Sequence, residues 1–428
     1  MNSSLNIFLN KKILIYGLGK SGLATFNFLK KKCEVFLYDD YLKNFKNLIS
    51  YKNLKKTKFD FIIISPGIDI NKCKLSKFLK KNLKKIYTDL DIFFSFFKND
   101  CITITGTNGK STTCQLLYEI LLQQKYHVKL VGNIGNPILS LNKIRPKTIF
   151  IVEASSYQLE YSKIFRSKYS AILNLSPDHI ERHKTLNRYI KSKFKLLQNQ
   201  LKHHFAFVKK DDLLIKKHIK FNSFNGKIIR INTKETKNFL KNLNNKYFST
   251  ETNKENLSFV FELSRKLKLR NSIFIKTIQK FNGLKYRQQI IFKRKYLTII
   301  NDSKSTSFSS SINLFYYYNN IFWILGGQPK KNDKFDFKNK KNYNVQAYIF
   351  GKNKKFFTKQ LKNKMKFQVF PTIKKAYEKV LTDIKKFNIK KKKTILFSPS
   401  SASFDEFKNF EERGAYFNFL VKSFKGKL

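Results

Sequence analysis

Cysteine, proline and tryptophan are rare in this sequence of 428 residues, with 4, 7 and 1 copies, and these shortages exclude several kinds of protein. The cysteines form no C-x-x-C pair, which suits a reducing compartment and argues against a structural zinc site. No apolar run approaches the ~20 residues of a membrane-spanning helix. No basic leader followed by an apolar core opens the chain. We therefore expect a cytoplasmic protein of two or three domains without membrane insertion.

Acidic residues are also scarce, with 28 Asp and Glu against 87 Lys and Arg and a net charge of +59. A nucleic-acid binder is one interpretation, and it predicts basic residues gathered on one face. A compositional bias of the genome is the other, because only 10 of the basic residues are arginine and Lys, Asn, Phe, Ile and Tyr share A/T-rich codons. Proteins that specifically recognise nucleic-acid phosphates and bases tend to use arginine, whose planar guanidinium can donate two parallel hydrogen bonds. We favour the bias and expect no specific nucleic-acid partner.

The few glycines are informative where they occur, and the first of them open a nucleotide-binding pattern. A strand predicted over residues 13–16 runs into Gly17-x-Gly19-x-x-Gly22, a helix to about residue 32 and a second strand that ends in Asp39. Glycines allow a tight turn that approaches a phosphate closely, and an acid after the second strand can hold a ribose hydroxyl. The pattern predicts a Rossmann-like half. A nicotinamide-dependent dehydrogenase and a ligand-free turn remain alternatives.

A shortened phosphate-binding loop follows in the stretch CITITGTNGKSTTCQLL, residues 101–117. The common form of this loop is G-x-x-x-x-G-K-[ST], whereas only two residues separate the glycines here. Lys110 would balance phosphate charge and the Ser111 hydroxyl would ligate Mg²⁺. The residues expected to cradle the phosphates are Gly106, Thr107, Asn108, Gly109, Lys110, Ser111 and Thr112.

Polar residues stand at the carboxyl ends of the next two predicted strands, residues 148–155 and 169–176. Glu153 lies near the end of the first of them, and Pro177-Asp178-His179 follows the second. Ligands of open α/β sheets bind at that edge, so Glu153 and His179 are candidate metal ligands beside a triphosphate.

The last part of the chain, from residue 284, again alternates strands with helical segments such as 373–387. One strand ends in Gly326-Gly327 and another in SPSSAS, which predicts ligand-facing loops at the strand ends. The whole sequence therefore predicts an α/β fold of three domains, with ranges 1–95, 96–283 and 284–428.

Ten segments, in this order and across nearly the whole chain, resemble the Mur ligase family of ATP-dependent enzymes that form amide bonds in peptidoglycan precursor synthesis. They are GLGKSGLA at Gly17, SPGI at Ser65, TGTNGKST at Thr105, GNIG at Gly132, EASSYQLE at Glu153, NLSPDHIERH at Asn174, YRQQ at Tyr286, NDSKST at Asn301, LGGQPK at Leu325 and SPSSASFDEFKNFEERG at Ser398. The short phosphate loop is this family's variant. The resemblance implies a Rossmann-like domain for a uridine nucleotide, a central P-loop ATPase domain and a Rossmann-like C-terminal domain.

The resemblance also implies a reaction. ATP phosphorylates a substrate carboxylate, an amine attacks the acyl phosphate, and phosphate leaves. The serine-rich C-terminal motif favours transfer of D-glutamate onto UDP-N-acetylmuramoyl-L-alanine. A sister ligase that adds L-alanine, a dibasic amino acid or glutamate onto folate remains an alternative. We expect a monomer that uses ATP and two Mg²⁺ ions.

Site residues are carried over where this sequence matches the family's motifs. For ATP, besides the phosphate loop, they are Asn253, Asn256, Arg287 and Asp302. For the uridine-linked substrate they are Ser21, Asp39, Asn133, Ser155 and Gln158. For D-glutamate they are Lys304, Thr306, Lys330, Ser403 and Phe410. For metal they are Ser111, Glu153, His179 and Lys193. The catalytic residues are expected to be Lys110, Glu153, His179, Lys193 and Lys304.

Lys193 is the least obvious of these residues. It matches the lysine that CO₂ carbamylates in the family, four positions after Tyr189 and fourteen after His179. Carbamylation turns a cation into an anionic oxygen donor of the kind that Mg²⁺ prefers. The alternative is a solvated helix face, because Lys191, Lys193 and Lys195 alternate along the chain.

Four positions depart from the family's pattern. Thr252 and Tyr286 stand where histidines are usual, Ser307 replaces an asparagine, and Pro329 lies in a loop that is commonly glycine-rich. We expect these departures to alter affinity and not the class of reaction.

Overall fold

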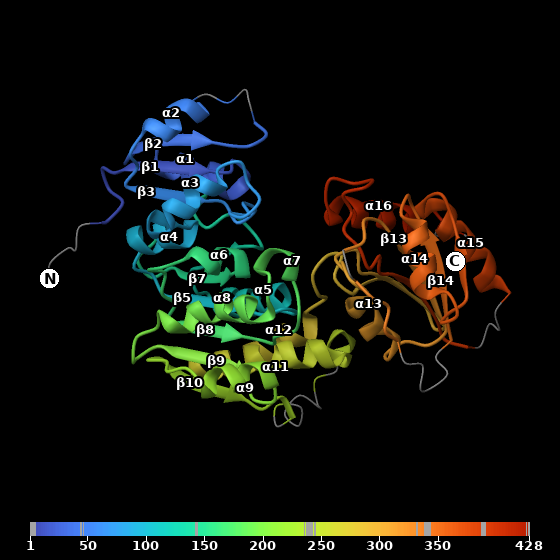
Figure 1. The fold of residues 1–428 in the computed structure, drawn as a ribbon. Coiled ribbons are helices and arrows are strands. Elements are labelled where there is room, and N and C mark those ends of the chain that lie inside the picture. The colour runs from blue at the N-terminus through green and yellow to red at the C-terminus, as the bar shows by residue number, and fades with distance from the viewer. Residues whose placement is uncertain are drawn as a thin grey trace. The chain divides into compact units, whose positions relative to one another are not determined.

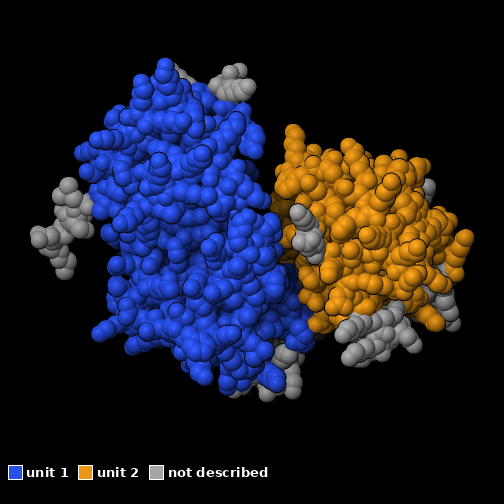
Figure 2. Space-filling view, in the orientation of Figure 1, with its two compact units in different colours: residues 1–281 blue, residues 282–428 orange. Residues whose placement is uncertain are grey.

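The structure is a computed structural model that describes residues 6–42, 45, 47–141, 144–234, 236, 243, 245–330, 333–337, 344–386, 391–424 and 426. The chain forms two compact units, residues 1–281 and 282–428, which Figure 2 shows in two colours. The described residues form three sheets, two in the first unit and one in the second. The predicted α/β class is confirmed, because helices alternate with largely parallel strands throughout (Figure 1).

The first sheet is parallel and has the order β2-β1-β3-β4. Its first turn carries the glycines of the Rossmann-like pattern. The helix after that turn ends at Leu29, three residues before the predicted end. The elements are β1 (Lys12–Tyr16), α1 (Lys20–Leu29), β2 (Glu34–Tyr38), α2 (Tyr51–Lys56), β3 (Phe61–Ile64), α3 (Ser76–Lys81), η1 (Leu83–Lys85), β4 (Ile86–Tyr87) and α4 (Asp89–Phe96).

The second sheet is also parallel and has the order β10-β9-β8-β5-β7-β6. Its elements are β5 (Cys101–Thr105), α5 (Lys110–Gln123), β6 (Val128–Gly132), β7 (Ile149–Glu153), α6 (Ser156–Tyr161), β8 (Tyr169–Ile172), α7 (Ile180–His183), α8 (Leu186–Gln198), β9 (Phe205–Lys209), α9 (Leu213–Lys220), β10 (Lys227–Ile231), η2 (Lys246–Ser249), α11 (Glu251–Lys266) and α12 (Asn271–Lys280). Strands β6 and β7, which follow β5 in the chain, lie on one side of it in the strand order, and β8 to β10 lie on the other side. The loop after β5 therefore lies at the switch point where open α/β sheets bind ligands.

The third sheet has the order β11-β12-β16-β13-β14-β15, and only the pairing of β11 with β12 is antiparallel among the described strands. Its elements are β11 (Gln289–Lys293), β12 (Leu297–Asn301), α13 (Phe308–Phe315), β13 (Ile321–Gly326), β14 (Val345–Phe350), α14 (Lys354–Leu361), β15 (Phe367–Val369), α15 (Ile373–Lys385), β16 (Lys393–Phe397) and α16 (Phe410–Ser423). The central strands β13 and β16 are buried along their whole length because helices cover both faces.

The first two sheets share a hydrophobic core, which explains why they form one compact unit. The rings of Phe93 on α4 and Phe150 on β7 lie 4.8 Å apart. Asp91 on α4 is fully buried, and one carboxylate oxygen accepts hydrogen bonds from the backbone amides of Lys163, Ile164 and Phe165. The predicted boundary between residues 95 and 96 lies inside this unit. The three domain ranges therefore stay a prediction.

No helix in the described part of the chain combines the length and the apolar character that a membrane crossing demands.

Candidate active site

The phosphate loop leaves the buried strand β5 and is held by the segment that follows β8. The backbone amides of Thr107 and Asn108 donate to the backbone and side-chain oxygens of Asn174, over 2.9 and 2.8 Å. The Thr107 hydroxyl lies 2.9 Å from the Tyr189 hydroxyl on α8. The NLSPDH motif and α8 therefore set the shape of the loop before any nucleotide binds.

Gly109 ends the loop in a backbone conformation that favours glycine, with φ at +84°. A Cβ added there would lie 2.0 Å from Oδ1 of Asn256 on α11, so strain and crowding both oppose a side chain. Asn253, one turn earlier on α11, is buried and donates to the Tyr247 carbonyl over 2.7 Å. The structure thus brings Asn256 to the loop.

Lys110 folds back over the loop that precedes it. Its ammonium donates to the carbonyls of Gly106 and Thr107 over 3.0 and 2.8 Å. The positive charge is therefore held at the place where the loop would take a phosphate.

Glu153 is buried at the end of β7 and has a hydrogen-bond donor on each carboxylate oxygen. The Ser111 hydroxyl donates to Oε2 over 2.6 Å, and the Asn133 amide donates to Oε1 over 2.8 Å. The carboxylate thus joins a predicted ATP residue to a predicted residue of the uridine-linked substrate.

The oxygen donors of Ser111 and Glu153 suit Mg²⁺, a hard cation. A serine hydroxyl can donate its proton to the carboxylate and still offer a lone pair to a cation. His179 immediately precedes α7 and has φ at +54°, and its ring lies 3.4 Å from the Asp178 carboxylate. Among the described residues, no three His, Cys, Asp or Glu side chains form a cluster that could hold a metal alone. Mg²⁺ commonly completes its shell with water and substrate phosphates, so the residues fit a site shared with a nucleotide.

Lys193 on α8 is buried beneath the phosphate loop, with 2% of its surface exposed. Its ammonium donates to the Gly106 carbonyl over 2.8 Å and to the Thr105 hydroxyl over 3.4 Å. Lys191 is exposed, and Lys195 donates to the Glu160 carbonyl. The solvated-face interpretation is therefore wrong for Lys193.

Burial lowers the pKa of Lys193 well below its ordinary value, and the nearby charge of Lys110 lowers it further. Asp178 and Glu153 oppose the shift without reversing it. The amine is consequently easier to deprotonate than an ordinary lysine.

Ser21 and Asp39 lie at the glycine-rich turn of the first sheet. The Asp39 carboxylate accepts hydrogen bonds from the backbone amides of Leu18, Tyr41 and Leu42 over 2.7, 2.9 and 3.1 Å. Partial burial alone would raise the pKa of Asp39, but these three amides lower it. Asp39 therefore organises the turn, and its contact with the uridine nucleotide stays a prediction.

Ser155 and Gln158 form a capping box at the start of α6. The Ser155 hydroxyl accepts a hydrogen bond from the backbone N–H of Gln158. Oε1 of Gln158 accepts one from the backbone N–H of Ser155, and each bond is 3.2 Å long. Nε2 of Gln158 lies 3.4 Å from both oxygens of Asp89, whose pKa burial raises to about 6. The sequence did not single out Asp89.

In the second unit, Asp302 is buried at the end of β12. Its oxygens accept from the Gln288 amide over 3.0 Å and from the Ser398 hydroxyl over 2.9 Å. Burial raises its pKa to about 7, although Ser398 and the nearby charge of Arg287 oppose the shift. Arg287 lies between two residues with positive φ, Tyr286 and Gln288, and the Tyr286 ring packs against Gly414.

The residues predicted for D-glutamate lie on neighbouring loops of this unit. The Lys304 ammonium lies 4.1 Å from the centre of the Phe410 ring. Gln328 and Ala402 exchange two backbone hydrogen bonds of 2.9 Å, which bring the loops of Lys330 and Ser403 together. Ser403 is buried, whereas Thr306 and Lys330 are half-buried. The substrate contacts themselves stay predictions.

Three residues with clear roles in these loops were missed in the sequence: Asn174, Tyr189 and Arg413. Asn174 and Tyr189 support the phosphate loop. Arg413 is fully buried under the serine-rich turn and is the last of the ten arginines in the chain. It lies inside the FEERG motif. Arginine is rare in this chain, so an arginine inside a motif was the signal that could have identified it.

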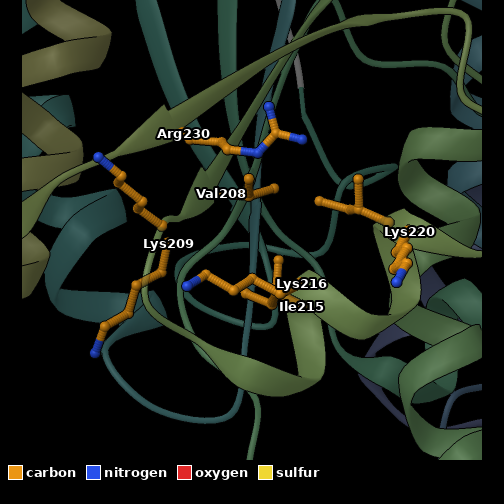
Figure 3. A pocket seen from close by; sticks show the side chains of 8 residues that line it. Val208, Lys209, Ile215, Lys216, Lys220 and Arg230 are labelled. Carbon is orange, nitrogen blue, oxygen red and sulfur yellow. The ribbon is translucent and has the colours of Figure 1, made fainter.

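A separate pocket of about 280 Å³ lies between β9, α9 and β10, and no predicted site residue lines it. Figure 3 shows the cationic ends of Lys216, Lys220 and Arg230 spread apart around Val208 and Ile215. Among the described residues, an ion pair at this pocket joins Lys209 to Glu255. The basic side chains do not converge on one point, as an anion site would require.

Comparison with known proteins places this geometry in a family. Residues 104–275 match the Mur ligase middle domain. The chain is 31% identical to a UDP-N-acetylmuramoylalanine--D-glutamate ligase of Rickettsia bellii, with 96% of this chain and 98% of the relative covered. It is 32% identical to a protein of the same name from Francisella tularensis, with 97% of each chain covered.

Solved structures show the same fold at lower identity. A UDP-N-acetylmuramate-alanine ligase of Thermotoga maritima matches with a TM-score of 0.54 and 16% identity, covering 98% of this chain and all of the other. A MurF ligase of Thermotoga maritima in complex with ADP matches with a TM-score of 0.56 and 13% identity, covering 99% and 97%. The near-complete coverage of relatives more than 30% identical to it shows that the chain belongs to the Mur ligase family, among the UDP-N-acetylmuramoylalanine--D-glutamate ligases.

Proposed function

We propose that this chain uses ATP to join D-glutamate to UDP-N-acetylmuramoyl-L-alanine. The observation that carries the proposal is the phosphate loop with Glu153, Ser111 and Lys193 packed around it, in a chain related over its whole length to ligases of that name.

The reaction requires a carboxylate of the muramoyl substrate to attack the γ-phosphorus of ATP. The bond from this phosphorus to the bridging oxygen breaks, ADP leaves, and an acyl phosphate forms. The amine of D-glutamate then attacks the acyl carbon, and the tetrahedral adduct loses phosphate and a proton to give the amide. Both partners of the first step are anions, so Lys110 and the loop amides must offset their repulsion.

Ser111, Glu153 and His179 are the residues that would hold Mg²⁺. A bound Mg²⁺ would neutralise charge on the phosphates and align the triphosphate for in-line transfer. Ser111 and Asn133 fix both oxygens of Glu153, so the carboxylate is oriented before a cation arrives.

We further propose that Lys193 is carbamylated. Its neutral amine would attack CO₂ through the nitrogen lone pair, forming an N–C bond and releasing one proton to give a carbamate. The lowered pKa supports this step, because only the neutral amine has the lone pair. The carbamate would place anionic oxygens next to a metal site that holds one buried carboxylate, Glu153.

The remaining expectations belong to the same proposal. We propose that the chain acts as a cytoplasmic monomer with three domains, 1–95, 96–283 and 284–428. The uridine-linked substrate would contact Ser21, Asp39, Asn133, Ser155 and Gln158. Arg287 and Asp302 would meet the γ-phosphate and the ribose of ATP.

The test is phosphate release by the purified chain with ATP, Mg²⁺, UDP-N-acetylmuramoyl-L-alanine and a panel of amino acids. We expect release only with D-glutamate, and we expect Lys110→Ala to abolish it while leaving the circular dichroism unchanged. Release that prefers L-alanine, a dibasic amino acid or a folate substrate would make the chain a sister ligase. Tight NADH binding, seen as enhanced fluorescence, would instead support a dehydrogenase.

A further inference from the structure

Four segments of the second unit carry the residues proposed to bind D-glutamate. One buried side chain stands on one of them, donates hydrogen bonds to two others and lies close to the remaining one. These segments are the loop after β12 with Lys304, the loop after β13 with Lys330, the serine-rich turn with Ser403, and the start of α16 with Phe410. Arg413 lies on the first turn of α16, three residues after Phe410. Its exposed fraction is 1%.

The guanidinium of Arg413 binds the first and third of these segments directly. Nε donates to the Ser303 hydroxyl over 3.1 Å, and one terminal nitrogen donates to the carbonyls of Ser303 and Ser401 over 2.7 and 2.9 Å. The other terminal nitrogen donates to the Ala402 carbonyl over 3.1 Å. Ser303 immediately precedes Lys304, and Ala402 immediately precedes Ser403.

The loop that carries Lys330 approaches the same guanidinium through Gly327. A Cβ added to Gly327 would lie 2.9 Å from a terminal nitrogen of Arg413 and 2.5 Å from the Ser401 hydroxyl. Gly327 also has φ at +124°, which disfavours other residues. The absence of a side chain at this position lets the loop close onto Arg413.

The contacts use a property that only arginine has. Its five N–H donors lie in one rigid plane, so one side chain can hold several carbonyls of different loops at fixed angles. A lysine at this position has a single nitrogen and cannot reach both loops with the same geometry.

Asp302, which is proposed to contact ATP, is held in place by other residues of the same unit. The Asp302 carboxylate is held by the Gln288 amide and the Ser398 hydroxyl, and Ser398 is hydrogen-bonded in turn to Ser311 over 2.6 Å. Arg413 makes none of these hydrogen bonds and reaches Asp302 through its charge alone, with a weaker effect on the Asp302 pKa than Ser398, Gln288 or Arg287. Removing it should therefore disturb the D-glutamate loops more than the proposed ATP contact.

We propose that Arg413 is a positioning residue for D-glutamate. It sets the places of Lys304 and Ser403 by binding the backbone beside them, and that of Lys330 by lying close to Gly327 in the same loop. The proposal rests on the proposed function and adds to it a residue that does not touch the substrate.

The experiment compares Arg413→Lys and Arg413→Met with the wild type in the full chain, by phosphate release at varied D-glutamate, ATP and UDP-N-acetylmuramoyl-L-alanine. We expect the KM for D-glutamate to rise about tenfold to a hundredfold, because charge-assisted hydrogen bonds that order the site are lost. The KM values for the other two substrates should change by no more than about twofold, which is far less than the loss of a charge-assisted hydrogen bond would cause. Arg413→Lys keeps the charge and serves if the Met variant fails to fold.

Val380→Ala is the matched control, because Val380 is buried in the core under α15 of the same unit and lies outside the four segments. It should lower the melting temperature and leave all KM values unchanged. An equal rise in all three KM values for Arg413→Lys, a rise for Val380→Ala of the same size, or no rise at all would each overturn the proposal. If the wild type itself shows no phosphate release with D-glutamate, the proposed function fails first, whatever Arg413 does.

Discussion

The two compact units each bury a cation beneath a loop proposed to bind a ligand, and the two cations are held in different ways. Lys193 lies under the phosphate loop with one carbonyl and one hydroxyl as acceptors, and its pKa is well below the ordinary value. Arg413 lies under the serine-rich turn with three carbonyls and one hydroxyl as acceptors. Burial lowers the pKa of Arg413 to about 10, so it stays charged at neutral pH.

The difference separates a reactive cation from a structural one. A buried ammonium with few acceptors gains by losing its proton, and the neutral amine that results is a nucleophile. A guanidinium whose donors are satisfied around its plane keeps both its charge and its position. The difference supports the proposed chemistry of Lys193 and the proposed positioning role of Arg413.

The largest expected effect comes from Lys193→Ala. This variant should lose nearly all ligase activity, because no other side chain would supply the carbamate oxygens. Lys191→Ala and Lys195→Ala are the matched controls on the same helix, and both should keep most of their activity. The measurement is phosphate release at saturating substrates.

Added short-chain carboxylates should partly restore Lys193→Ala by entering the vacated space. They should not restore Lys193→Arg, because its guanidinium fills that space and does not react with CO₂. Normal activity of Lys193→Ala would break the comparison, and a high-resolution map of active enzyme with a bare ammonium at Lys193 would do the same.

The second effect tests direct contact against positioning in the other unit. Ser403→Ala and Lys330→Ala should each raise the KM for D-glutamate by about tenfold to a hundredfold, the usual loss of a charge-assisted contact to a carboxylate. The KM for ATP should change little. Equal rises in both constants, measured by the same phosphate-release assay, would show that these residues act in closure and not in recognition.

A third, smaller effect concerns the buried acid Asp302. The folded pKa of Asp302 is about 7 and its ordinary value is 3.8, so between these pH values the folded state holds a proton that the unfolded state has lost. This group therefore makes the free energy of unfolding fall as pH rises from about 4 to about 7, by at most about 1.4 kcal/mol per pH unit. Asp302→Asn should remove this contribution.

The single tryptophan makes this measurement specific to the second unit. Trp323 is buried on β13, and its indole N–H donates to the Ser398 carbonyl over 2.8 Å. Urea unfolding followed by its fluorescence at pH 5 and pH 7 should show a smaller pH dependence for Asp302→Asn than for the wild type. The same dependence in both proteins would show that the Asp302 proton does not differ between the folded and unfolded states.

The smallest effect is expected for exposed cations. The wild type should retain DNA weakly and without saturation, and added DNA should leave ligase activity unchanged. A dedicated binder with 6–10 phosphate contacts would instead lose roughly 10³–10⁵ in affinity between 50 and 200 mM salt. Sub-micromolar, sequence-specific binding at physiological salt would contradict this expectation.

Two charge-reversed variants localise any DNA retention that is found. Lys216→Glu with Lys220→Glu changes the basic pocket, and Lys77→Glu with Lys80→Glu changes two exposed lysines of α3. Equal losses of retention in both variants would indicate a diffuse field. A loss confined to the pocket variant would indicate a site there.

Much of the fold could be predicted from the sequence, because each strand that leads to a motif is a short buried apolar run between turn residues. The strand before Gly106 and the one before Ser398 are examples, and both are buried throughout. The shared core of the first two sheets could not be predicted. It depends on pairs such as Phe93 and Phe150, which are far apart in sequence and resemble any other apolar residues.

The site divides in the same way. Glycine, lysine and serine at fixed spacing predict a phosphate loop because the chemistry constrains adjacent residues. Supports such as Tyr189 and Arg413 act across the fold, and only the structure shows what they touch. The alternation of Lys191, Lys193 and Lys195 suggested a solvated helix face. In the helix Lys191 is exposed, Lys195 is half-buried and Lys193 is buried.

The contact of Asn133 with Glu153 has a consequence for the order in which ligands bind. In the proposed site these two residues serve different ligands, yet the Asn133 amide occupies one oxygen of Glu153. A cation that takes that oxygen frees the amide, and a muramoyl substrate that takes the amide frees the oxygen. Thermodynamic reciprocity then requires each ligand to change the affinity of the other by the same factor. Titrating the cation with and without the muramoyl substrate would measure that shared factor.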